Sequence, residues 1–338
     1  MFLYINYPKF IHPEIFPGIP FLGLLRWYGL MYIVAFSLAY IALRKVMKEG
    51  ALDSEGFKCT EDDIFSFIFC GIIFLLLGAR IGHCLIYTPQ IYLKAPWLIL
   101  WPFRNGHFTG FAGMSYHVGF IGGLIGMLVW CYVKKKPAAK WIDAMVCAIP
   151  LGYTFGRIGN FLNGELYGRI TTVPWGMTFN DPNVKLFSTS EQWVQDFCAK
   201  IGMDIQNMAY VNLPRHPSQL YEALFEGLLL WAVIWALRNH KKFDGMLACI
   251  YTGGYGLVRF VIEYFRQPDE DIGYRLGDKG ASIYQNTSIW NFSTGQILCF
   301  IMIIASIGFA IWLYIRDKKQ KESGLLAKAE KISKKSKK

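Results

Sequence analysis

The chain consists of long apolar runs separated by short polar intervals. Residues 293–315 contain no Asp, Glu, Lys or Arg, and the shorter runs over 27–43 and 64–79 are equally free of charge. A helix needs about 20 apolar residues to cross a bilayer, whereas a membrane β-barrel shows short segments of alternating polarity. The pattern therefore predicts an all-α integral membrane protein. Its seven expected transmembrane helices cover residues 27–43, 64–87, 113–133, 141–157, 217–237, 246–263 and 293–315.

One long polar insert interrupts this pattern. Residues 165–214, between the fourth and fifth expected helices, contain a Pro-Trp-Gly motif and a mixed polar stretch, and they predict a small external head. Polar residues 267–291 form a second, shorter external segment. The expected organisation is an external N-terminal segment over 1–26, a seven-helix transmembrane domain over 27–315 that includes the head, and a basic cytoplasmic tail over 316–338. The end of the tail is rich in lysine and lacks an apolar stripe, so we expect it to be disordered.

Basic residues indicate the orientation across the membrane. Cytoplasmic loops are enriched in Lys and Arg, and with seven helices the basic loops after residues 43, 133 and 237 fall on the same side as the tail. The C-terminus is then cytoplasmic and the N-terminus external. The tail holds ten basic and three acidic residues and so supplies +7 of the net charge of +11. A lysine-rich segment directly after a membrane span suits anionic lipid headgroups, so we expect a membrane partner and no nucleic acid.

The eight cysteines are scattered and mostly lie in apolar runs. No two of them have the CxxC spacing that is typical of metal and redox motifs. In apolar surroundings a free cysteine packs as a small hydrophobic residue. We therefore expect no metal and no cofactor.

The most informative stretch is 156–165, Gly-Arg-Ile-Gly-Asn-Phe-Leu-Asn-Gly-Glu. It places an arginine, two carboxamides and a carboxylate at the end of an apolar run, and charged groups at membrane depth usually line a protein interior or a wet cavity. Arg157 and Asn160 share a helix face at i, i+3. Two interpretations stay open. Arg157 binds a phosphate through its planar fork, or it pairs with Glu165 to hold the head.

Three polar clusters precede this stretch, and each has a structural and a functional interpretation. Tyr28 follows Arg26 and Trp27 and fits an interfacial anchor as well as a site residue. Arg80, within Gly-Ala-Arg-Ile-Gly, either snorkels to the interface or marks close helix packing by the small residues around it. His117 begins a Gly-rich helix and is either a core residue or a base near neutral pH.

Two later helices carry the last cluster. A helix entry, Arg-His-Pro-Ser-Gln-Leu-Tyr-Glu, ends at Glu222, and Glu226 follows at i+4. Along the sixth expected helix, Tyr255, Arg259 and Glu263 recur every four residues on one face. Arg259 and Glu263 fit an intrahelical ion pair, and such a pair inside a membrane is also a candidate functional site.

Taken together, these clusters hold at least two buried arginines, a histidine and several carboxylates near the external half of the membrane. A phosphate in a low-dielectric site needs cationic partners. The set therefore predicts an anionic ligand that enters from the bilayer, and a phospholipid headgroup fits best.

The motifs resemble, in order, the sequence blocks of the bacterial phosphatidylglycerol–prolipoprotein diacylglyceryl transferase family. The stretch over 156–165, continued to Gly168 and Arg169, is similar to the family signature. The other similar blocks are Trp27–Tyr32, Gly78–Gly82, Gly113–His117, Pro174–Gly176, Arg215–Glu222, Tyr255 and Gly256 with Arg259, and Arg266–Asp269. The resemblance covers residues 20–315.

The resemblance implies seven helices, an external N-terminus and a multi-pass enzyme of the bacterial cytoplasmic (inner) membrane. It also implies the reaction. The diacylglyceryl group of phosphatidylglycerol moves to the thiol of the lipobox cysteine of a prolipoprotein, which yields a thioether and glycerol phosphate. Phosphatidylglycerol and the lipobox of the signal peptide are then the expected partners.

The chemistry of that reaction assigns roles to the matching residues as hypotheses. A thiol with a pKa of about 8.5 is only a few per cent thiolate at neutral pH, so a base is expected. His117 occupies a position that the family treats as important and is the first candidate for the base, with Glu165 and Glu263 as alternatives. Arg157 and Arg259 hold the phosphate oxygens and stabilise the leaving charge. The expected substrate-binding residues are Tyr28, Arg80, Asn160, Asn163, Gly168, Tyr255 and Glu263.

The chain departs from the family pattern at Val118, because the family commonly has glycine after the histidine. Residues 180–212 and the lysine-rich tail match no family block. A membrane transporter of an organic anion is the alternative function, since buried arginines and broken helices suit it, but it leaves the ordered motifs unexplained. An intramembrane protease fits less well, because the chain lacks Gly-x-Ser-Gly and Gly-x-Gly-Asp motifs.

Overall fold

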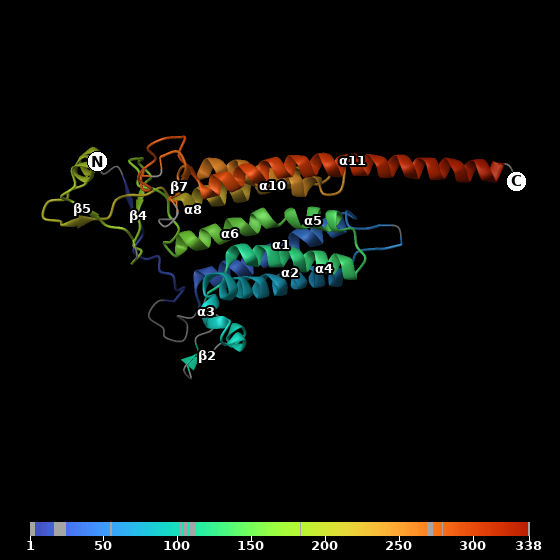
Figure 1. Cartoon of the computed structure of the whole chain (residues 1–338), viewed down its shortest axis with the longest axis horizontal. Helices are drawn as coiled ribbons and strands as arrows, with labels where there is room; N and C mark the ends of the chain where they lie inside the picture. Colours follow the sequence, from blue (N-terminus) through green and yellow to red (C-terminus); the bar gives the residue numbers. More distant parts are fainter. Residues whose placement is uncertain are drawn as a thin grey trace. The chain divides into compact units, whose positions relative to one another are not determined.

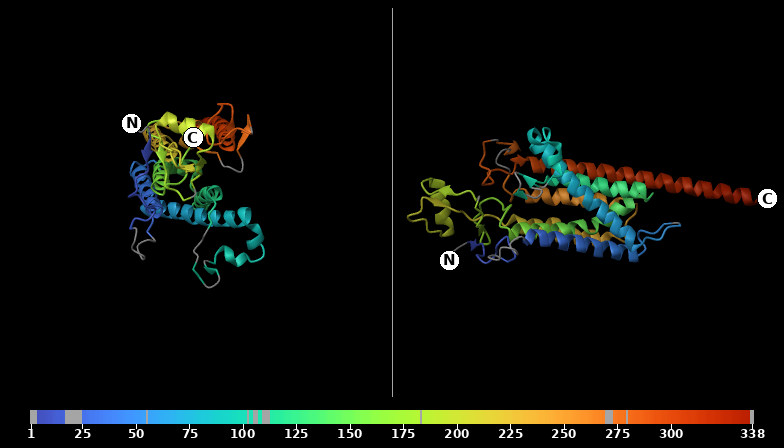
Figure 2. Two further views of the ribbon diagram at one scale, coloured as in Figure 1. Left: turned by 90° about the vertical axis from the view of Figure 1, so that its left-hand side faces the viewer. Right: turned by 90° about the horizontal axis from the view of Figure 1, so that it is seen from below.

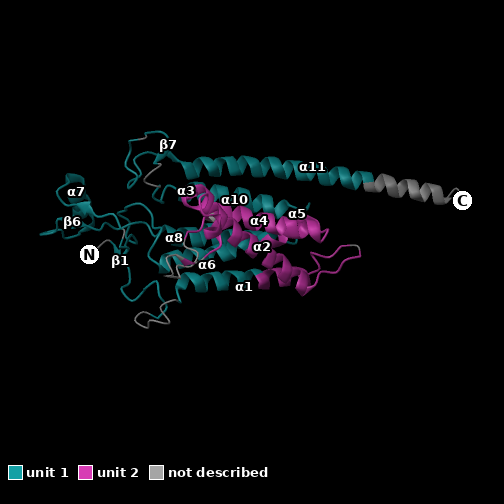
Figure 3. Ribbon diagram, turned by 60° about the horizontal axis from the view of Figure 1, so that its bottom comes forward, with its two compact units in different colours: residues 1–39, 146–338 teal, residues 40–145 magenta. Residues whose placement is uncertain are grey.

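The protein is mostly helical (Figure 1). It divides into two compact units, unit 1 with residues 1–39 and 146–338 and unit 2 with residues 40–145 (Figure 3). The computed structural model describes residues 4–16, 25–54, 56–101, 103–104, 107–108, 113–182, 184–268, 273–278 and 280–336. Residues 17–24 of the expected N-terminal segment lie outside the described residues, and so do Asp269 and Lys279.

The longer helices account for most of the described chain. They are α1 (Trp27–Lys48), α2 (Glu61–Gly82), α4 (Tyr116–Val133), α5 (Ala138–Val146), α6 (Ile149–Leu162), α7 (Gln192–Ile201), α9 (Leu230–Leu237), α10 (Met246–Ile262) and α11 (Thr294–Ser336). The short helical segments are the π-helix η2 (His83–Tyr87), α3 (Pro89–Tyr92), the 3-10 helix η3 (Pro96–Ile99), α8 (Ser218–Tyr221) and the π-helix η4 (Glu222–Leu229).

Six of the seven predicted helices are found close to their predicted positions. Four helical segments in the described part of the chain are long and apolar enough to cross a membrane, namely Trp27–Lys48, Glu61–Tyr87, Ser218–Leu237 and Thr294–Ser323. Two shorter apolar helices cover His117–Val133 and Met246–Ile262. This set of apolar helices is that of a multi-pass membrane protein.

The helix predicted over 141–157 is two helices instead. α5 ends at Val146 and α6 begins at Ile149 with Pro150 in its first turn. Proline cannot donate a backbone hydrogen bond, and its ring clashes with the carbonyl four residues earlier, which is that of Val146, so the helix is interrupted here. Trp231 Nε1 donates to the carbonyl of Cys147 at 3.1 Å, which satisfies one backbone group at the break. Since α6 begins after the break and ends at Leu162, beyond the predicted end at residue 157, it includes most of the 156–165 stretch.

The prediction of a disordered C-terminal tail is wrong. α11 continues from its apolar part through Ser336, well past the end of α10 in Figures 1 and 2. Lysine, glutamate, alanine and leucine are good helix formers, and a helix already nucleated in the membrane extends without a new nucleation cost. Lys321 Nζ lies 2.6 Å from Asp317 Oδ2, an i, i+4 pair that supports the extension.

Unit 2 is centred on the close packing of α2 against α4. A capping box at Thr60 and Asp63 starts α2. Small residues then let the two backbones approach, since a Cβ added at Gly78 would lie 3.1 Å from the Cα of Gly122. This confirms that the small residues around Arg80 mark helix packing. At the far end of the pair, the rings of Trp130 and Trp141 lie 4.5 Å apart.

Unit 1 contains α6, η4, α9, α10 and α11 as a packed helical bundle. α10 packs along α11, and η4 packs against both α6 and α10. The wide turns of η4 leave backbone groups for other partners. One of them, the Ala223 carbonyl, accepts a hydrogen bond from Thr154 Oγ1 of α6 at 3.3 Å.

The chain between α6 and α8 forms a small subdomain of unit 1, called the head below. The antiparallel strands β5 (Phe187–Ser188) and β6 (Tyr210–Val211) lie with α7 over a core of Ile170, Phe187, Val194, Cys198, Val211 and Leu213. β1 (Ile5–Asn6) from the N-terminal segment pairs in parallel with β4 (Met177–Thr178). The remaining strand pairs are β2 (Phe103–Arg104) with β3 (His107–Phe108) in unit 2, and β7 (Tyr274–Leu276) with β8 (Phe292–Ser293).

Candidate active site

The 156–165 stretch ends α6 and forms a chain of polar contacts. Arg157 Nη1 donates to Asn160 Oδ1 at 3.4 Å, as expected for residues on one helix face. The carboxamides of Asn160 and Asn163 then donate to Glu165 Oε1 at 3.0 and 3.3 Å. The Glu165 backbone carbonyl accepts from Gln219 Nε2 at 2.6 Å, which fixes the turn after α6 to α8. Glu165 is therefore oriented by two neutral carboxamides.

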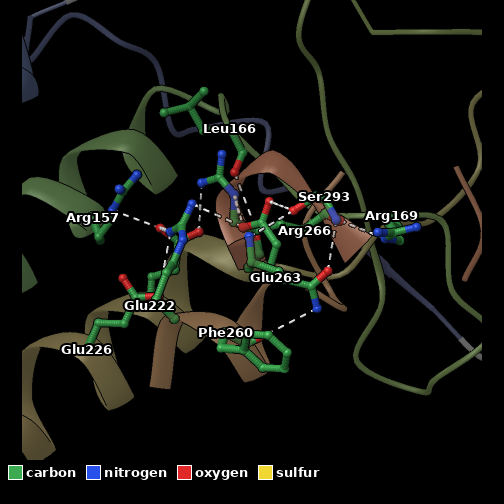
Figure 4. A network of polar contacts seen from close by, with 12 residues as sticks. Arg157, Leu166, Arg169, Glu222, Glu226, Phe260, Glu263, Arg266 and Ser293 are labelled. Carbon is green, nitrogen blue, oxygen red and sulfur yellow. Dashed lines mark hydrogen bonds and ion pairs between the residues drawn. The ribbon is translucent and has the colours of Figure 1, made fainter. Parts of the chain in front are cut away.

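The ion pair of Arg157 is with Glu222 rather than with Glu165. Arg157 Nε lies 2.9 Å from Glu222 Oε2, Arg259 Nη1 lies 3.0 Å from the same oxygen, and Arg266 Nη1 lies 3.1 Å from Glu222 Oε1. The Glu222 side chain is fully buried. A single carboxylate at the start of η4 thus holds guanidinium groups from α6, from α10 and from the chain after α10 (Figure 4).

Two more glutamates complete the group. Glu226, also fully buried, lies 3.5 Å from Arg259 Nη1 and accepts a short hydrogen bond from the Tyr153 hydroxyl. Glu263 lies 3.3 Å from Arg259 Nη2 and 3.7 Å from Arg266 Nε, and it accepts from Ser293 Oγ at 3.0 Å. The predicted intrahelical pair of Arg259 and Glu263 is confirmed, but it is one part of a larger group. We call this group the arginine–glutamate cluster, and its members are Arg157, Arg259, Arg266, Glu222, Glu226 and Glu263.

The cluster can bind an anion because its guanidinium groups are fixed before any ligand arrives. Each arginine is held by carboxylates from other segments, and the side chains of Arg157 and Arg259 are 15% and 14% exposed. Buried, preorganised guanidinium groups act on charge much more strongly than solvated ones. Tyr153 also helps to hold Arg157 in place, since the Arg157 guanidinium lies over its ring at 4.8 Å.

Two further predicted residues of unit 1 contact elements that carry the cluster. Tyr255 stacks edge-to-face on Tyr153 with ring centroids 5.8 Å apart. Tyr28 packs near Gly159 on α6, where an added Cβ would lie 3.4 Å from its ring, and its hydroxyl accepts from Tyr32 at 3.2 Å. Tyr28 therefore contacts the helix that carries the 156–165 stretch.

Gly168 and its neighbours connect the head to the cluster. Gly168 forms a bridge with Arg266, and an added Cβ would overlap the Phe265 carbonyl oxygen. Arg169, which is buried, donates from Nε to the Arg266 carbonyl at 2.7 Å (Figure 4). Burial, with a smaller contribution from Arg169, lowers the pKa of the adjacent His216 to about 4. Because the Phe265 carbonyl approaches residue 168 so closely, only glycine fits at this position.

Arg80 and His117 belong to unit 2. The buried Arg80 guanidinium donates to the carbonyls of Ile99, Leu98 and Gly113 at 2.7, 3.1 and 3.3 Å. It thereby holds the segment after η2 against α2. His117 lies in the first turn of α4, and its side chain is exposed.

Comparison with known proteins decides what kind of protein carries this cluster. The model of the family described as prolipoprotein diacylglyceryl transferase matches residues 19–312. The chain belongs to the prolipoprotein diacylglyceryl transferase family. Similar proteins named phosphatidylglycerol–prolipoprotein diacylglyceryl transferase occur in Treponema denticola and in Treponema pallidum. The first is 53% identical over 95% of this chain and 98% of its own length, and the second is 49% identical over 92% and 96%.

A more distant relative of the same name, from Chlorobaculum tepidum, is 38% identical over 85% of this chain and 86% of its own length. The matches run across both units, from the N-terminal helix to α11. They support an enzyme, and they do not support the alternative of an anion transporter. The recognition from ordered motifs is therefore confirmed.

Part of the cluster is not apparent from the sequence alone. Glu222 and Glu226 read as a helix entry, Arg266 belongs to a block similar to the family, and nothing in the local pattern distinguishes Tyr153. The signal for the glutamates was present, because two carboxylates four residues apart in an apolar helix need cations nearby. Their shared partners come from three segments far apart in sequence, and spacing along one helix does not reveal them.

The departure at Val118 is accommodated by a neighbouring glycine. A Cβ added at Gly82 of α2 would overlap the Val118 side chain. Val118 therefore fills the space above Gly82 and packs between α2 and α4. The extra bulk is absorbed by helix packing within unit 2.

Proposed function

We propose that this protein transfers the diacylglyceryl group of phosphatidylglycerol to the thiol of the lipobox cysteine of prolipoproteins, the first step of lipoprotein maturation. The observation that carries the proposal is the convergence of Arg157 and Arg259 on the buried carboxylate of Glu222. A phosphodiester at low dielectric needs such preorganised cations. Membership of the family, whose members are named for phosphatidylglycerol and prolipoprotein, identifies the anion and the acceptor.

The reaction forms one bond and breaks one bond. The thiol sulfur bonds to the terminal glycerol carbon of the diacylglyceryl group, and the bond from that carbon to the phosphate ester oxygen breaks. The electron pair of the broken bond leaves with glycerol phosphate, and the thiol proton passes to a base. In this proposal Arg157 and Arg259 hold the phosphate oxygens and stabilise the charge that develops on the leaving oxygen.

We propose His117 as the base, because a neutral imidazole accepts a proton at neutral pH. Glu165 is the second candidate, since its carboxylate is oriented by the carboxamides of Asn160 and Asn163. Glu263 is a poorer one, because its carboxylate is already engaged by Arg259, Arg266 and the Ser293 hydroxyl. Tyr28, Tyr255 and the two asparagines are proposed to line the lipid headgroup.

We further propose seven membrane spans in the bacterial cytoplasmic membrane, with residues 1–26 and the head outside and residues 316–338 inside. The pairing of β1 with β4 supports this arrangement. This pairing requires the N-terminal segment and the head to lie on the same side of the membrane. The chain must therefore cross the membrane an even number of times between them. The four spans expected before the head meet that requirement, with α5 and α6 counted together as one.

The test is mass spectrometry of a synthetic lipobox peptide incubated with the purified protein and phosphatidylglycerol. The peptide is expected to gain the mass of one diacylglyceryl group on its cysteine. Arg157→Ala and Arg259→Ala are expected to abolish the gain. Arg44→Ala is the matched control, because this arginine is exposed and pairs with Glu61 in unit 2. A folded wild-type protein that gives no product would overturn the proposal.

A further inference from the structure

The arginine–glutamate cluster is electrically balanced without a ligand. Its three guanidinium groups and three carboxylates sum to zero when all are ionised, and all six side chains are mostly or fully buried. Glu165, joined to Arg157 through Asn160, adds a further negative charge nearby. A phosphodiester therefore brings an uncompensated negative charge into a buried site, and an uncompensated buried charge is strongly unfavourable.

One carboxylate of the cluster is held much less tightly than the others. Glu222 contacts three arginines at 2.9 to 3.1 Å. Glu263 contacts two arginines and the Ser293 hydroxyl. Within the described residues, the ion pair of Glu226 is the 3.5 Å contact with Arg259, and its carboxylate also accepts from the Tyr153 hydroxyl. Glu226 is thus the carboxylate whose charge is most easily lost.

We propose that Glu226 takes up a proton when a phosphodiester headgroup binds at Arg259, and releases it when the phosphate product leaves. The inference rests on the proposed function and deepens it, because it makes the site selective for a headgroup with one net negative charge. The incoming phosphate oxygen replaces Glu226 at Arg259 Nη1. The proton comes from solvent hydronium, whose O–H bond breaks as the O–H bond of Glu226 forms, and it returns to water when the phosphate product leaves.

The surroundings of Glu226 suit such a neutral carboxyl group. Among the described residues, the titratable and charged groups that face it from its own and neighbouring helices are Tyr153, Arg157, Glu222, Arg259 and Cys299, and Tyr255 packs behind Tyr153. With Arg259 turned to the ligand, the nearest remaining charge on its own helix is the like charge of Glu222. A hydrogen bond with Tyr153 remains available to a protonated Glu226, since a carboxyl group both donates and accepts.

The test measures protons rather than product. Phosphatidylglycerol in nonionic detergent is titrated into the full-length protein by calorimetry, in buffers of different ionisation enthalpy, between about pH 5 and about pH 9. Wild-type protein is expected to take up about one proton, and its affinity to fall about tenfold per pH unit where uptake is complete. Glu226→Gln, a neutral mimic, is expected to take up none and to bind with an affinity that does not change with pH. Glu191→Gln, an exposed head residue, is the matched control that keeps the uptake.

Each outcome decides the inference. Binding by wild-type protein with no proton uptake at any pH overturns it, whatever the fate of the variant. Equal uptake by wild type and Glu226→Gln also overturns it, because the proton then goes elsewhere. The lipobox peptide assay separates these results from failure of the proposed function. Product formation without proton uptake overturns only the role of Glu226, and absence of both lipid binding and product overturns both proposals.

Discussion

Glu222 is the residue whose replacement tests the cluster most directly. Glu222→Gln keeps the shape of the side chain but removes the charge that three guanidinium groups share at 2.9, 3.0 and 3.1 Å. Removing one partner of a buried ion pair costs about 3–5 kcal/mol, because the other charges stay buried without compensation. We therefore expect a loss of thermal stability of about 5–10 °C. Diacylglyceryl transfer should fall at least tenfold, since Arg157 and Arg259 lose their common anchor.

The assay is thermal unfolding of the purified protein in detergent, followed by fluorescence, together with the lipobox peptide assay. Glu322→Gln on the exposed part of α11 is the control, and it should shift the unfolding free energy by less than about 0.5 kcal/mol. Combining Glu222→Gln with Arg266→Gln removes one charge of each sign. The double variant should lose about 1–3 kcal/mol less than the sum of the two single losses. Additive losses, or a Glu222→Gln protein as stable and active as the parent, would refute the view that Glu222 holds the three arginines.

Three further predictions concern residues that support the site. Gly82→Ala should destabilise the protein by about 1–3 kcal/mol through overlap with Val118, and adding Val118→Gly should restore most of the loss in thermal unfolding. Gly168→Ala should destabilise the junction of head and bundle by a similar amount, about 1–3 kcal/mol, because its methyl group meets the Phe265 carbonyl; limited proteolysis of the head would report it. The folded protein holds the pKa of His216 at about 4, below its ordinary value of 6.5, so the unfolded chain binds this proton first as the pH falls. Stability should therefore be full above pH 6.5 and decline toward pH 4. The decline should be smaller in His216→Gln, and an equal decline in both proteins would contradict the prediction.

Local patterns are enough to place most helices and two of the three arginines of the cluster. Apolar runs locate six helices, and the capping box at Thr60 and Asp63 lies where the second run begins. Arg157 and Arg259 were predicted because an arginine in an apolar run is costly unless it has a function or a partner. These features depend on a few neighbouring residues, so they can be read from the sequence.

Features that depend on contacts between distant segments were not predicted. The partner of Arg157 is Glu222 of a separate helix, whereas the sequence suggested the nearby Glu165. The π-helical turns of η4 depend on Thr154 of α6, which bonds the Ala223 carbonyl. Pro150, at the break between α5 and α6, does not by itself predict a break, because membrane helices tolerate proline.

The pairing of β1 with β4 also sets an order of assembly during synthesis. Asn6 and Thr178 are 172 residues apart, yet their side chains share a hydrogen bond of 2.8 Å. At about 5–20 residues per second, the ribosome needs roughly 10–30 s to make the second strand after the first. During that interval the apolar side chain of Tyr7, which is buried against Phe161 and Phe179 in the finished protein, has no partner to cover it. Strand β1 is therefore made early and reaches its final place late, and a tag fused before Ile5 would interfere with the completion of the head rather than with its start.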